Sequence, residues 1–252
     1  MNTAVCIKRV PETGAKIVLT DDKQAIDTSS IGFTISPHEE CGIEEAVQLA
    51  EETGGTATAL TLGSPEADEQ LRTGLAMGVD EAIHLETDGE EWGPRATATA
   101  IADGIESADE SFDLLFFGTE SADQENYQVG VRVAHELGYP VVTGIKDVET
   151  DGDTVVAERE VSGGSEIFEV PTPAVVTVKE GLHSPRYPSM RSKMQARSAE
   201  VDSLTAERTE VNDVTMVELE APEDDDSPAE ILGESADAAE DVVSVLEDLE
   251  VL

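Results

Sequence analysis

Short apolar runs alternate with segments of helical apolar spacing along the first part of this chain, and that rhythm limits the folds open to it. Four runs have the length and apolar content of buried strands: 3–8, 57–62, 81–85 and 113–117. Helix-like segments lie between them, and two of these begin with a proline after a turn, at Ser36-Pro37 and Gly93-Pro94. Successive strand and helix units require crossover connections, which favour a parallel sheet. We therefore predict an α/β fold with a mostly parallel, Rossmann-like sheet and helices on both faces.

The rhythm changes after Gly138-Tyr139-Pro140. Short strand-like runs follow, and Asp151-Gly152 and Gly163-Gly164 have the composition of tight turns; the runs are 141–143, 145–148, 154–161, 166–170 and 174–178. Tight turns join antiparallel neighbours, so we expect an antiparallel extension. The predicted organisation is a nucleotide-binding α/β domain with this extension (1–180), a partner-recognition loop (181–200), and a C-terminal arm (201–252) with an acidic linker and a terminal amphipathic helix.

The loop after the run at 113–117 is the strongest candidate for a ligand site. Carboxyl ends of parallel strands and amino ends of the following helices line the ligand crevice of open α/β sheets. The loop offers donors and acceptors for a ribose and a phosphate at Asp123, Gln124, Asn126, Tyr127 and Gln128. It has neither a Walker nor a GxGxxG glycine pattern, so its spacing alone favours a surface loop with Asn126 as an ordinary helix cap.

Acidic residues dominate the charge of the chain. Asp and Glu number 56 against 15 Lys and Arg, a formal net charge of −41. This sign excludes nucleic acid as a natural partner. The carboxylates are spread along the chain and 39% of residues are hydrophobic, which favours a folded protein over a disordered one. Because molar salt screens charges over roughly 3 Å, such a surface suits a salt-rich cytoplasm, and we predict an origin in a halophilic archaeon.

Cysteine and histidine usage predicts neither a disulfide framework nor a metal site. Cys6 and Cys41 lack CxxC spacing, and the four histidines are scattered without an HExxH pattern. No apolar run approaches the roughly 18 residues of a membrane span and no secretory segment is evident, so we expect a cytoplasmic protein that does not insert into membranes.

One segment is basic in this acidic chain. Residues 182–197 contain Arg186, Arg191, Lys193 and Arg197. The segment can be read as a solvated loop, or as a contact segment for another protein or an anionic cofactor with Met190 or Met194 as an apolar knob.

Several stretches, taken in order, resemble the beta subunit of electron transfer flavoprotein, the ETF beta or FixA family, with an adenine nucleotide alpha-hydrolase-like sheet. The stretches are Val5-Cys6-Ile7-Lys8-Arg9-Val10-Pro11, the Ser36-Pro37 helix entry, Leu71-Arg72-Thr73-Gly74-Leu75-Ala76-Met77-Gly78, Gln128-Val129-Gly130, Glu158-Arg159-Glu160-Val161-Ser162-Gly163-Gly164, Pro173-Ala174-Val175-Val176-Thr177-Val178 and Pro185-Arg186-Tyr187-Pro188-Ser189. The likeness runs from residue 3 to about residue 200 and is weaker in the tail.

The resemblance implies a heterodimer with an alpha subunit, FAD held mostly by alpha, and an adenine nucleotide in beta. The positions that it assigns to the nucleotide are Cys6, Ser36, Pro37, His38, Glu39, Leu62, Gly63, Thr97, Gly118, Asp123, Gln124, Glu125, Asn126, Tyr127, Gln128 and Val129. The family's usual Asn at the helix entry is Ser36 here, and the acidic cluster of the loop is Asp123-Gln124-Glu125.

The resemblance also implies an electron carrier without turnover of its own, linked to fatty acid oxidation. Flavin dehydrogenases, such as those of acyl-CoA, would dock on residues 184–199, with Met190 as the apolar anchor beside Arg186, Tyr187 and Met194. A glutamate matching Glu160 would restrain the mobile flavin domain of alpha. Electrons would pass to a membrane ETF-quinone oxidoreductase or a FixC-like protein.

Two branches of the family differ in the ligand held by beta. One holds AMP as a structural filler, and an electron-bifurcating FixAB type holds a second FAD. This chain keeps the Ala96-Thr97 pair favoured by the bifurcating branch, but it has Gly93-Pro94 where that branch has Asp-Thr, and Asn126 where it often has Thr. AMP is therefore the preferred prediction. Two other hypotheses are an ATP-binding stress-type or hydrolase protein on the same sheet, and a structural subunit with a vestigial nucleotide site.

Overall fold

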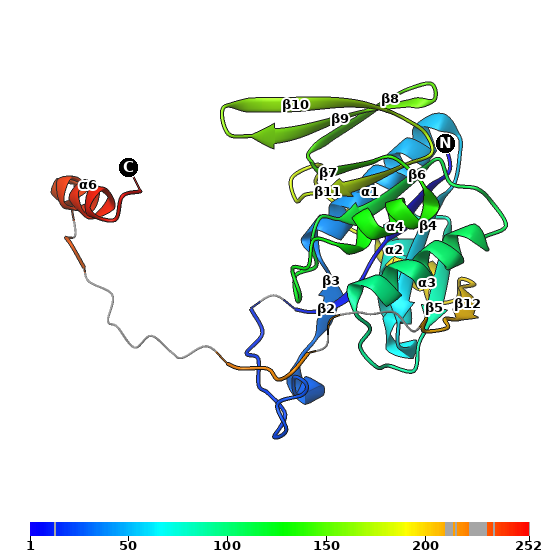
Figure 1. Cartoon of the computed structure of the whole chain (residues 1–252), viewed down its shortest axis with the longest axis horizontal. Helices are drawn as coiled ribbons and strands as arrows, with labels where there is room; N and C mark the ends of the chain where they lie inside the picture. The colour runs from blue at the N-terminus through cyan, green and yellow to red at the C-terminus, as the bar shows by residue number, and fades with distance from the viewer. Residues whose placement is uncertain (13, 210–213, 215, 222–230, 234, 252) are drawn as a thin grey trace.

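A seven-stranded parallel sheet forms the centre of the molecule in the computed structural model, which describes residues 1–12, 14–209, 214, 216–221, 231–233 and 235–251 (Figure 1). The strand order is β12-β5-β4-β1-β6-β11-β7, and every neighbouring pair is parallel. The strands are β1 (Thr3–Cys6), β4 (Ala57–Gly63), β5 (Glu81–Glu86), β6 (Leu114–Gly118), β7 (Val141–Ile145), β11 (Ala174–Val178) and β12 (Asp202–Thr205). The predicted parallel α/β sheet is confirmed.

Strand β1 lies at the middle of the sheet, and the strand order reverses there. All four of its residues are buried, as expected for a strand covered on both faces. It pairs with β4 on one side and β6 on the other, where Cys6 is the register partner of Leu60 and of Phe117. A crevice at the carboxyl end of such a switch point is the usual ligand position in open α/β sheets.

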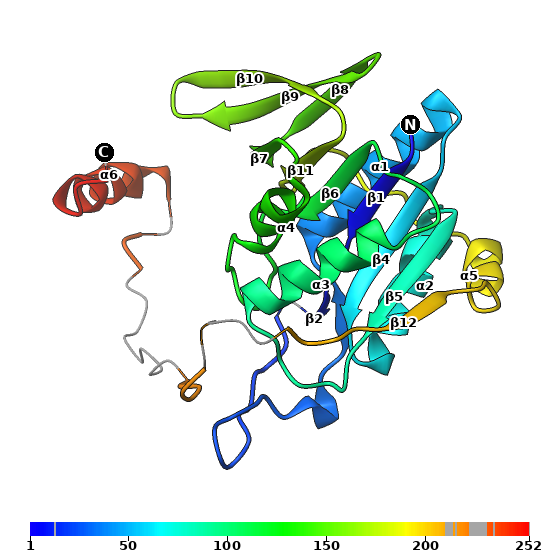
Figure 2. The ribbon, with the colours of Figure 1, turned by 45° about the vertical axis from the view of Figure 1, so that its right-hand side comes forward.

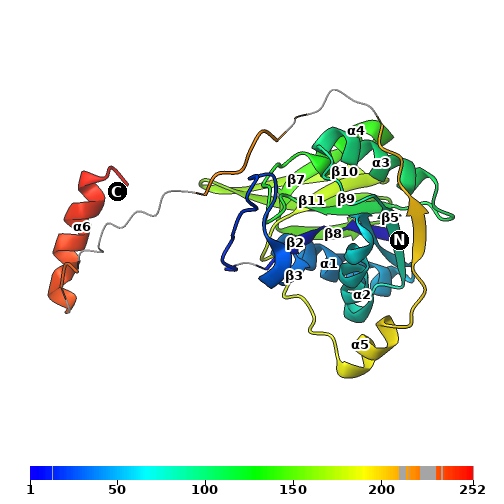
Figure 3. The same ribbon diagram turned by 90° about the horizontal axis from the view of Figure 1, so that it is seen from below.

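Two helices cover each face of the sheet (Figure 3). Helices α1 (Pro37–Thr53) and α2 (Asp68–Met77) lie on one face, and α3 (Pro94–Glu106) and α4 (Val129–Leu137) lie on the other. Alternate β1 residues serve the two cores: Val5 packs with the first pair of helices, and Ala4 and Cys6 with the second. Gly42 lets α1 lie close to the sheet, because an added Cβ there would stand 3.3 Å from Val178.

Helix α1 begins as the sequence predicts. Ser36 is the N-cap residue with extended backbone, Pro37 follows it in the first turn, and Gly54 ends the helix in the left-handed conformation with φ 72. The Ser36 hydroxyl makes no capping hydrogen bond, although Ser36 occupies the N-cap position.

Helix α4 begins at Val129, and its N-cap is Gln128, two residues later than the Asn126 cap considered from the sequence. Asn126 therefore does not cap the helix, and its side chain donates to Gln124 Oε1 at 3.2 Å. The reading of Asn126 as an ordinary cap is wrong. The physical reason is backbone conformation: Glu125 (φ 48) and Tyr127 (φ 55) occupy the left-handed region, which keeps the loop out of the helix.

The antiparallel extension is a sheet of its own. Strands β8 (Asp147–Asp151), β9 (Thr154–Val161) and β10 (Gly164–Pro171) have the order β10-β9-β8 and form a layer beside the central sheet (Figures 1 and 2). β7 belongs to the central sheet, because it pairs in parallel with β11. The sequence analysis placed residues 141–145 in the antiparallel extension, and that placement is wrong. They form an edge strand of the central sheet, in which Val142 and Ile145 are buried.

The remaining elements surround this body. Strands β2 (Arg9–Pro11) and β3 (Phe33–Ile35) form an antiparallel pair, single helical turns lie at η1 (Thr28–Ser30), η2 (Pro65–Ala67) and η3 (Ala236–Ala238), and α5 (Met190–Ala196) packs beside α2. Helix α6 (Ala239–Asp248) matches the predicted terminal helix and stands apart from the body (Figure 1). None of the helices in the described residues has the length and apolar character needed to cross a membrane.

Two differences from the sequence analysis concern the last third of the chain. Residues 202–205, placed in the arm by composition, form β12 and extend the central sheet beside β5. The predicted irregular loop at 181–200 contains α5, whose cap residue Ser189 accepts from the Ser192 N–H. Most of the predicted acidic linker at 220–235 lies outside the described residues.

Candidate functional site

A cavity of about 280 Å3 opens at the carboxyl ends of the strands on both sides of the switch point. Eleven of the sixteen residues that the sequence analysis assigns to a nucleotide line it: Cys6, Glu39, Leu62, Gly63, Thr97, Gly118, Gln124, Asn126, Tyr127, Gln128 and Val129. They come from β1, α1, β4, α3, β6, the loop before α4 and the first residue of α4. The fold therefore gathers segments that lie far apart in the sequence at one end of the sheet.

The other five residues lie in the same segments but do not line the cavity. Ser36 is buried, and its Oγ has no hydrogen-bond partner among the described residues. Pro37 is the first residue of α1, and His38 contacts Glu120. Asp123 pairs with Lys8 of the cavity wall, and Glu125 has positive φ in the loop.

The sequence analysis missed a second group of lining residues. They follow β1 and β5, or complete the loop after β6, and include Lys8, Arg9, Thr87, Gly89, Glu90, Glu91, Trp92, Thr119, Glu120 and Ser121. Their signal was present, because each set directly follows a predicted strand, and all such ends meet at one edge of a parallel sheet. Trp92 is 9% exposed and gives the cavity an apolar wall.

Glu39 is a buried carboxyl group at the cavity. It is 6% exposed, and its Oε2 accepts the backbone N–H of Lys8 at 2.8 Å. Burial raises the pKa of Glu39 to about 8, against the opposing effects of the Lys8 N–H and the Lys8 charge. The neutral acid therefore prevails at pH 7, and this side chain can donate as well as accept a hydrogen bond.

Two basic residues, Lys8 and Arg9, follow the carboxyl end of β1 and line the cavity. Lys8 Nζ lies 2.6 Å from Asp123 Oδ2, which ties the start of the candidate loop to the first strand. Arg9 stacks on the ring of Phe33, 3.3 Å from its centroid, and its buried Nε has no hydrogen-bond partner among the described residues. An unpartnered buried donor is costly, so a ligand oxygen is a natural acceptor for it.

Cys6 is not a reactive thiol in this setting. Burial raises its pKa far above the ordinary value, and the nearby charge of Glu39 adds to that effect. The protonated thiol packs as a small apolar group at the end of β1. Cys6 therefore contributes to the shape of the cavity wall.

The candidate loop is joined to α1 through one histidine. The backbone N–H of Glu180 donates to His38 Nδ1 at 2.6 Å, so the ring proton resides on Nε2, which faces Glu120 Oε1 at 3.4 Å. A hydrogen bond with Glu120 is also the main cause that raises the pKa of Tyr127. The loop after β6, the start of α1 and the chain after β11 thus meet at this imidazole.

Comparison with known proteins agrees with this architecture. The family model described as "Electron transfer flavoprotein domain" matches residues 24–209. The chain is 34% identical to "Electron transfer flavoprotein subunit beta" of Bacillus subtilis over 254 residues, which cover 98% of this chain and 97% of the relative. The protein of the same name from Mus musculus is 32% identical over 99% of this chain and 98% of its own length. A third protein of this name, from Thermoanaerobacterium thermosaccharolyticum, is 36% identical over 84% of this chain and 81% of its own length.

This chain belongs to the electron transfer flavoprotein beta-subunit family. Family membership supports a role in electron transport as part of a flavoprotein. The family resemblance noted in the sequence is thereby confirmed.

The residues that the family resemblance assigns to partner contacts lie at the surface, away from the cavity. Tyr187, Met190 and Met194 are 88%, 76% and 67% exposed and come from α5 and the chain before it. Glu160 lies on β9, and Lys146 Nζ approaches it at 3.4 Å. Arg186 differs from the others, because its guanidinium is bound to acidic residues of α1.

Proposed function

We propose that this chain is the beta subunit of a heterodimeric electron transfer flavoprotein. The αβ pair would accept electrons from flavin dehydrogenases, such as those acting on acyl-CoA, onto an FAD held mainly by alpha. It would deliver them to a membrane quinone oxidoreductase of the ETF or FixC-like type. The beta chain contributes binding and positioning and has no turnover of its own.

The cavity at the switch point of the sheet is the observation that carries the nucleotide assignment. Its wall holds an unpartnered buried Nε–H of Arg9, a carboxyl group of Glu39 that can donate, and amide side chains at Gln124, Asn126 and Gln128. Gly118 keeps the floor open, since a Cβ there would stand 2.9 Å from Glu39 Cγ. These groups suit an adenine nucleotide with its ribose and phosphate.

We assign AMP to this cavity. Its volume of about 280 Å3 lies at the small end of the range of roughly 300–1,000 Å3 usual for ligand pockets, which fits a mononucleotide better than a dinucleotide. Bound there, AMP fills the cavity and links the segments around it. FAD supplies the redox chemistry of the heterodimer, and the residues of this chain orient the partners.

The alternative is a second FAD in beta, as in bifurcating proteins of the FixAB type. Thr97, one half of the pair that this branch favours, lines the cavity at the start of α3. The cavity wall formed by Glu90, Glu91 and Trp92 is a loop, so a larger ligand would have to displace or extend past it.

Cofactor analysis of the complex decides between the two. The chain is co-expressed with its alpha subunit, purified in molar salt and denatured, and the released FAD and AMP are quantified. One FAD and one AMP per heterodimer is the expected result. Two FAD without AMP would establish the bifurcating type, and a heterodimer without nucleotide in beta would refute the proposed site. ATP hydrolysis by beta alone would favour a stress-type ATP-binding protein instead.

A further inference from the structure

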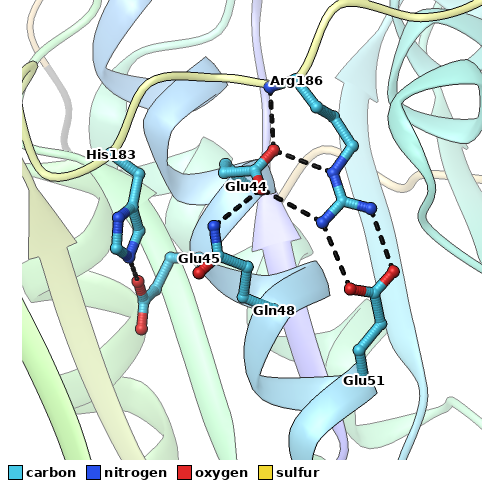
Figure 4. Close-up of polar contacts among 6 residues, drawn as sticks. All are labelled: Glu44, Glu45, Gln48, Glu51, His183 and Arg186. Atoms are coloured by element: carbon cyan, nitrogen blue, oxygen red, sulfur yellow. Dashed lines mark hydrogen bonds and ion pairs between the residues drawn. The ribbon is translucent and has the colours of Figure 1, made fainter.

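The recognition segment, residues 181–200, is fastened to the side of α1 by two neighbouring polar contacts. Figure 4 shows His183 reaching from the segment to Glu45, and Arg186 reaching to Glu44 and Glu51, all on that helix. The partners are separated by more than a hundred residues of sequence, with 142 between Glu44 and Arg186. These contacts fix the chain immediately before the exposed side chains of Tyr187 and Met190.

Arg186 makes the larger of the two contacts. Its backbone N–H and its Nε both donate to Glu44 Oε2 at 2.9 Å, and its two terminal nitrogens reach Glu51 at 3.0 and 3.3 Å. Gln48 donates to the other oxygen of Glu44 at 2.7 Å. Glu44 is only 4% exposed, so its carboxylate depends on these donors. Burial acts to raise the pKa of Glu44, but the hydrogen bonds from Arg186 and Gln48 outweigh burial and lower it.

His183 makes the second contact. Its Nε2 lies 2.6 Å from Oε2 of Glu45, which is 2% exposed, and its backbone carbonyl accepts from Cys41 Sγ at 3.3 Å. Burial raises the pKa of Glu45, while the His183 ring opposes that shift, and Asp147 and Glu52 are the other charges that face it. We call the side chains of Glu44, Glu45, Glu51, His183 and Arg186 the α1 clamp.

The opposite end of α1 lies at the nucleotide cavity. Glu39, in the first turn, lines the cavity, and His38 beside it joins Glu120 of the cavity wall to the backbone N–H of Glu180. Glu180 directly precedes the recognition segment, three residues before His183. The segment is therefore attached to α1 at a point beside the cavity and again at the clamp.

We propose that the nucleotide in the cavity positions the recognition segment through His38 and the α1 clamp. The proposal rests on the proposed function and deepens it, because it gives the bound nucleotide a role in partner docking beyond filling space. His38, His183 and Arg186 are positioning residues: they act on the docking side chains through the backbone between 180 and 187.

The physical basis is restriction of a short connection. A ligand that contacts the loop at 119–128 restrains Glu120, which holds the Nε2 side of the His38 ring, and the same ring accepts from Glu180. Without the ligand the loop becomes more mobile, and its greater mobility weakens the attachment at Glu180. The clamp alone must then order the segment. Because coupling between two binding sites is reciprocal in free energy, partner docking would in turn strengthen nucleotide binding.

Hydrogen exchange on the αβ heterodimer tests the proposal. Backbone exchange of residues 181–197 is measured in molar salt for complexes refolded with AMP and without it. We expect AMP to slow exchange in this range by roughly fivefold or more in the wild type. The effect should disappear in His38→Ala and return in His38→Gln, whose amide can both accept and donate. His135→Ala, a change of an exposed histidine on α4, is the matched control and should keep the full effect.

The clamp is tested separately with AMP bound. Arg186→Lys keeps the charge but loses the forked contact with Glu44 and Glu51, so it should speed exchange of 187–197 and raise KM for the heterodimer with an acyl-CoA dehydrogenase while AMP content stays unchanged. Glu51→Gln should act in the same direction. Glu106→Gln is the control, because this exposed residue of α3 lies outside the clamp and forms no ion pair among the described residues.

The outcomes separate this inference from the proposed function. AMP bound at one per heterodimer, with no effect on exchange of 181–197 or with an equal effect in His38→Ala, overturns the coupling and leaves the proposed function standing. A complex that binds no nucleotide in beta overturns both. If His38→Ala itself releases AMP, Arg186→Lys decides: normal exchange and an unchanged KM in that variant refute the clamp as a positioning device.

Discussion

The buried carboxyl group of Glu39 leads to a quantitative prediction about stability and pH. The side chain is 6% exposed and accepts a backbone hydrogen bond from Lys8. Glu39→Gln keeps its size and its acceptor oxygen but removes its ability to ionise. Comparison of the two proteins across pH therefore isolates the ionisation of one group.

The size of the effect follows from the pKa shift. The pKa of Glu39 is raised from 4.5 to about 8, mainly by burial. The folded protein therefore binds this proton more tightly than the unfolded chain, so the contribution to stability is complete below about pH 4.5 and is lost as pH rises through about 8. At about 1.4 kcal/mol for each pKa unit, ionisation costs the folded state roughly 3 to 5 kcal/mol by pH 8.5.

Urea unfolding of the full chain, at fixed molar salt and at several values between about pH 5 and pH 8.5, measures this cost. The free energy of unfolding of Glu39→Gln, relative to wild type, should rise by about 3 to 4 kcal/mol across that range. Glu106→Gln, an exposed change on α3, is the control and should run parallel to wild type. If Glu39→Gln also runs parallel to wild type, the carboxyl group ionises freely and the reasoning from burial fails.

Three further outcomes are expected. Met190→Ala should slow electron delivery from a dehydrogenase about tenfold, because an exposed apolar anchor is lost, with unchanged flavin content; loss of flavin would instead assign the segment to the fold. Gly118→Ala should reduce the AMP retained after gel filtration and destabilise the chain by about 1 to 3 kcal/mol, because the new Cβ would stand 2.9 Å from Glu39 Cγ and 3.1 Å from the Glu120 carbonyl oxygen. Gly164→Ala is the control and should do neither, because it has open space around it. Lowering salt from about 2 M to about 0.1 M should lower Tm, because the Debye length grows to about 10 Å and a net charge of −41 repels itself; an unchanged Tm would contradict adaptation to salt.

The sequence by itself determined the parallel α/β body and the edge of the sheet where the candidate site lies. The apolar residues 114–117 and 57–61 are buried, so their composition is fixed by the core and can be read directly. The helix start at Ser36-Pro37 could also be predicted, because the residues that begin a helix act locally. The residues after β4 and β6 could be assigned to one crevice, because the carboxyl ends of parallel strands meet at one edge of the sheet.

Only the tertiary structure showed which strands the later strands pair with. β7 pairs with β11, and β12 with β5, across long stretches of chain, and no local pattern distinguishes such an edge strand from a hairpin member or an arm. The tertiary structure also showed that α4 starts after Tyr127, since backbone conformation in a loop depends on what surrounds it.

The same limit applies to charge. Among 56 acidic residues, the sequence does not mark Glu39, Glu44 and Glu45 as buried, because a carboxyl group's exposure depends on the packing of distant segments around it. Arg186 belongs to a basic stretch by sequence, yet its partners lie on α1, 142 residues away for Glu44. Local composition determines which groups carry charge, and the fold determines which of those groups form ion pairs and which are buried.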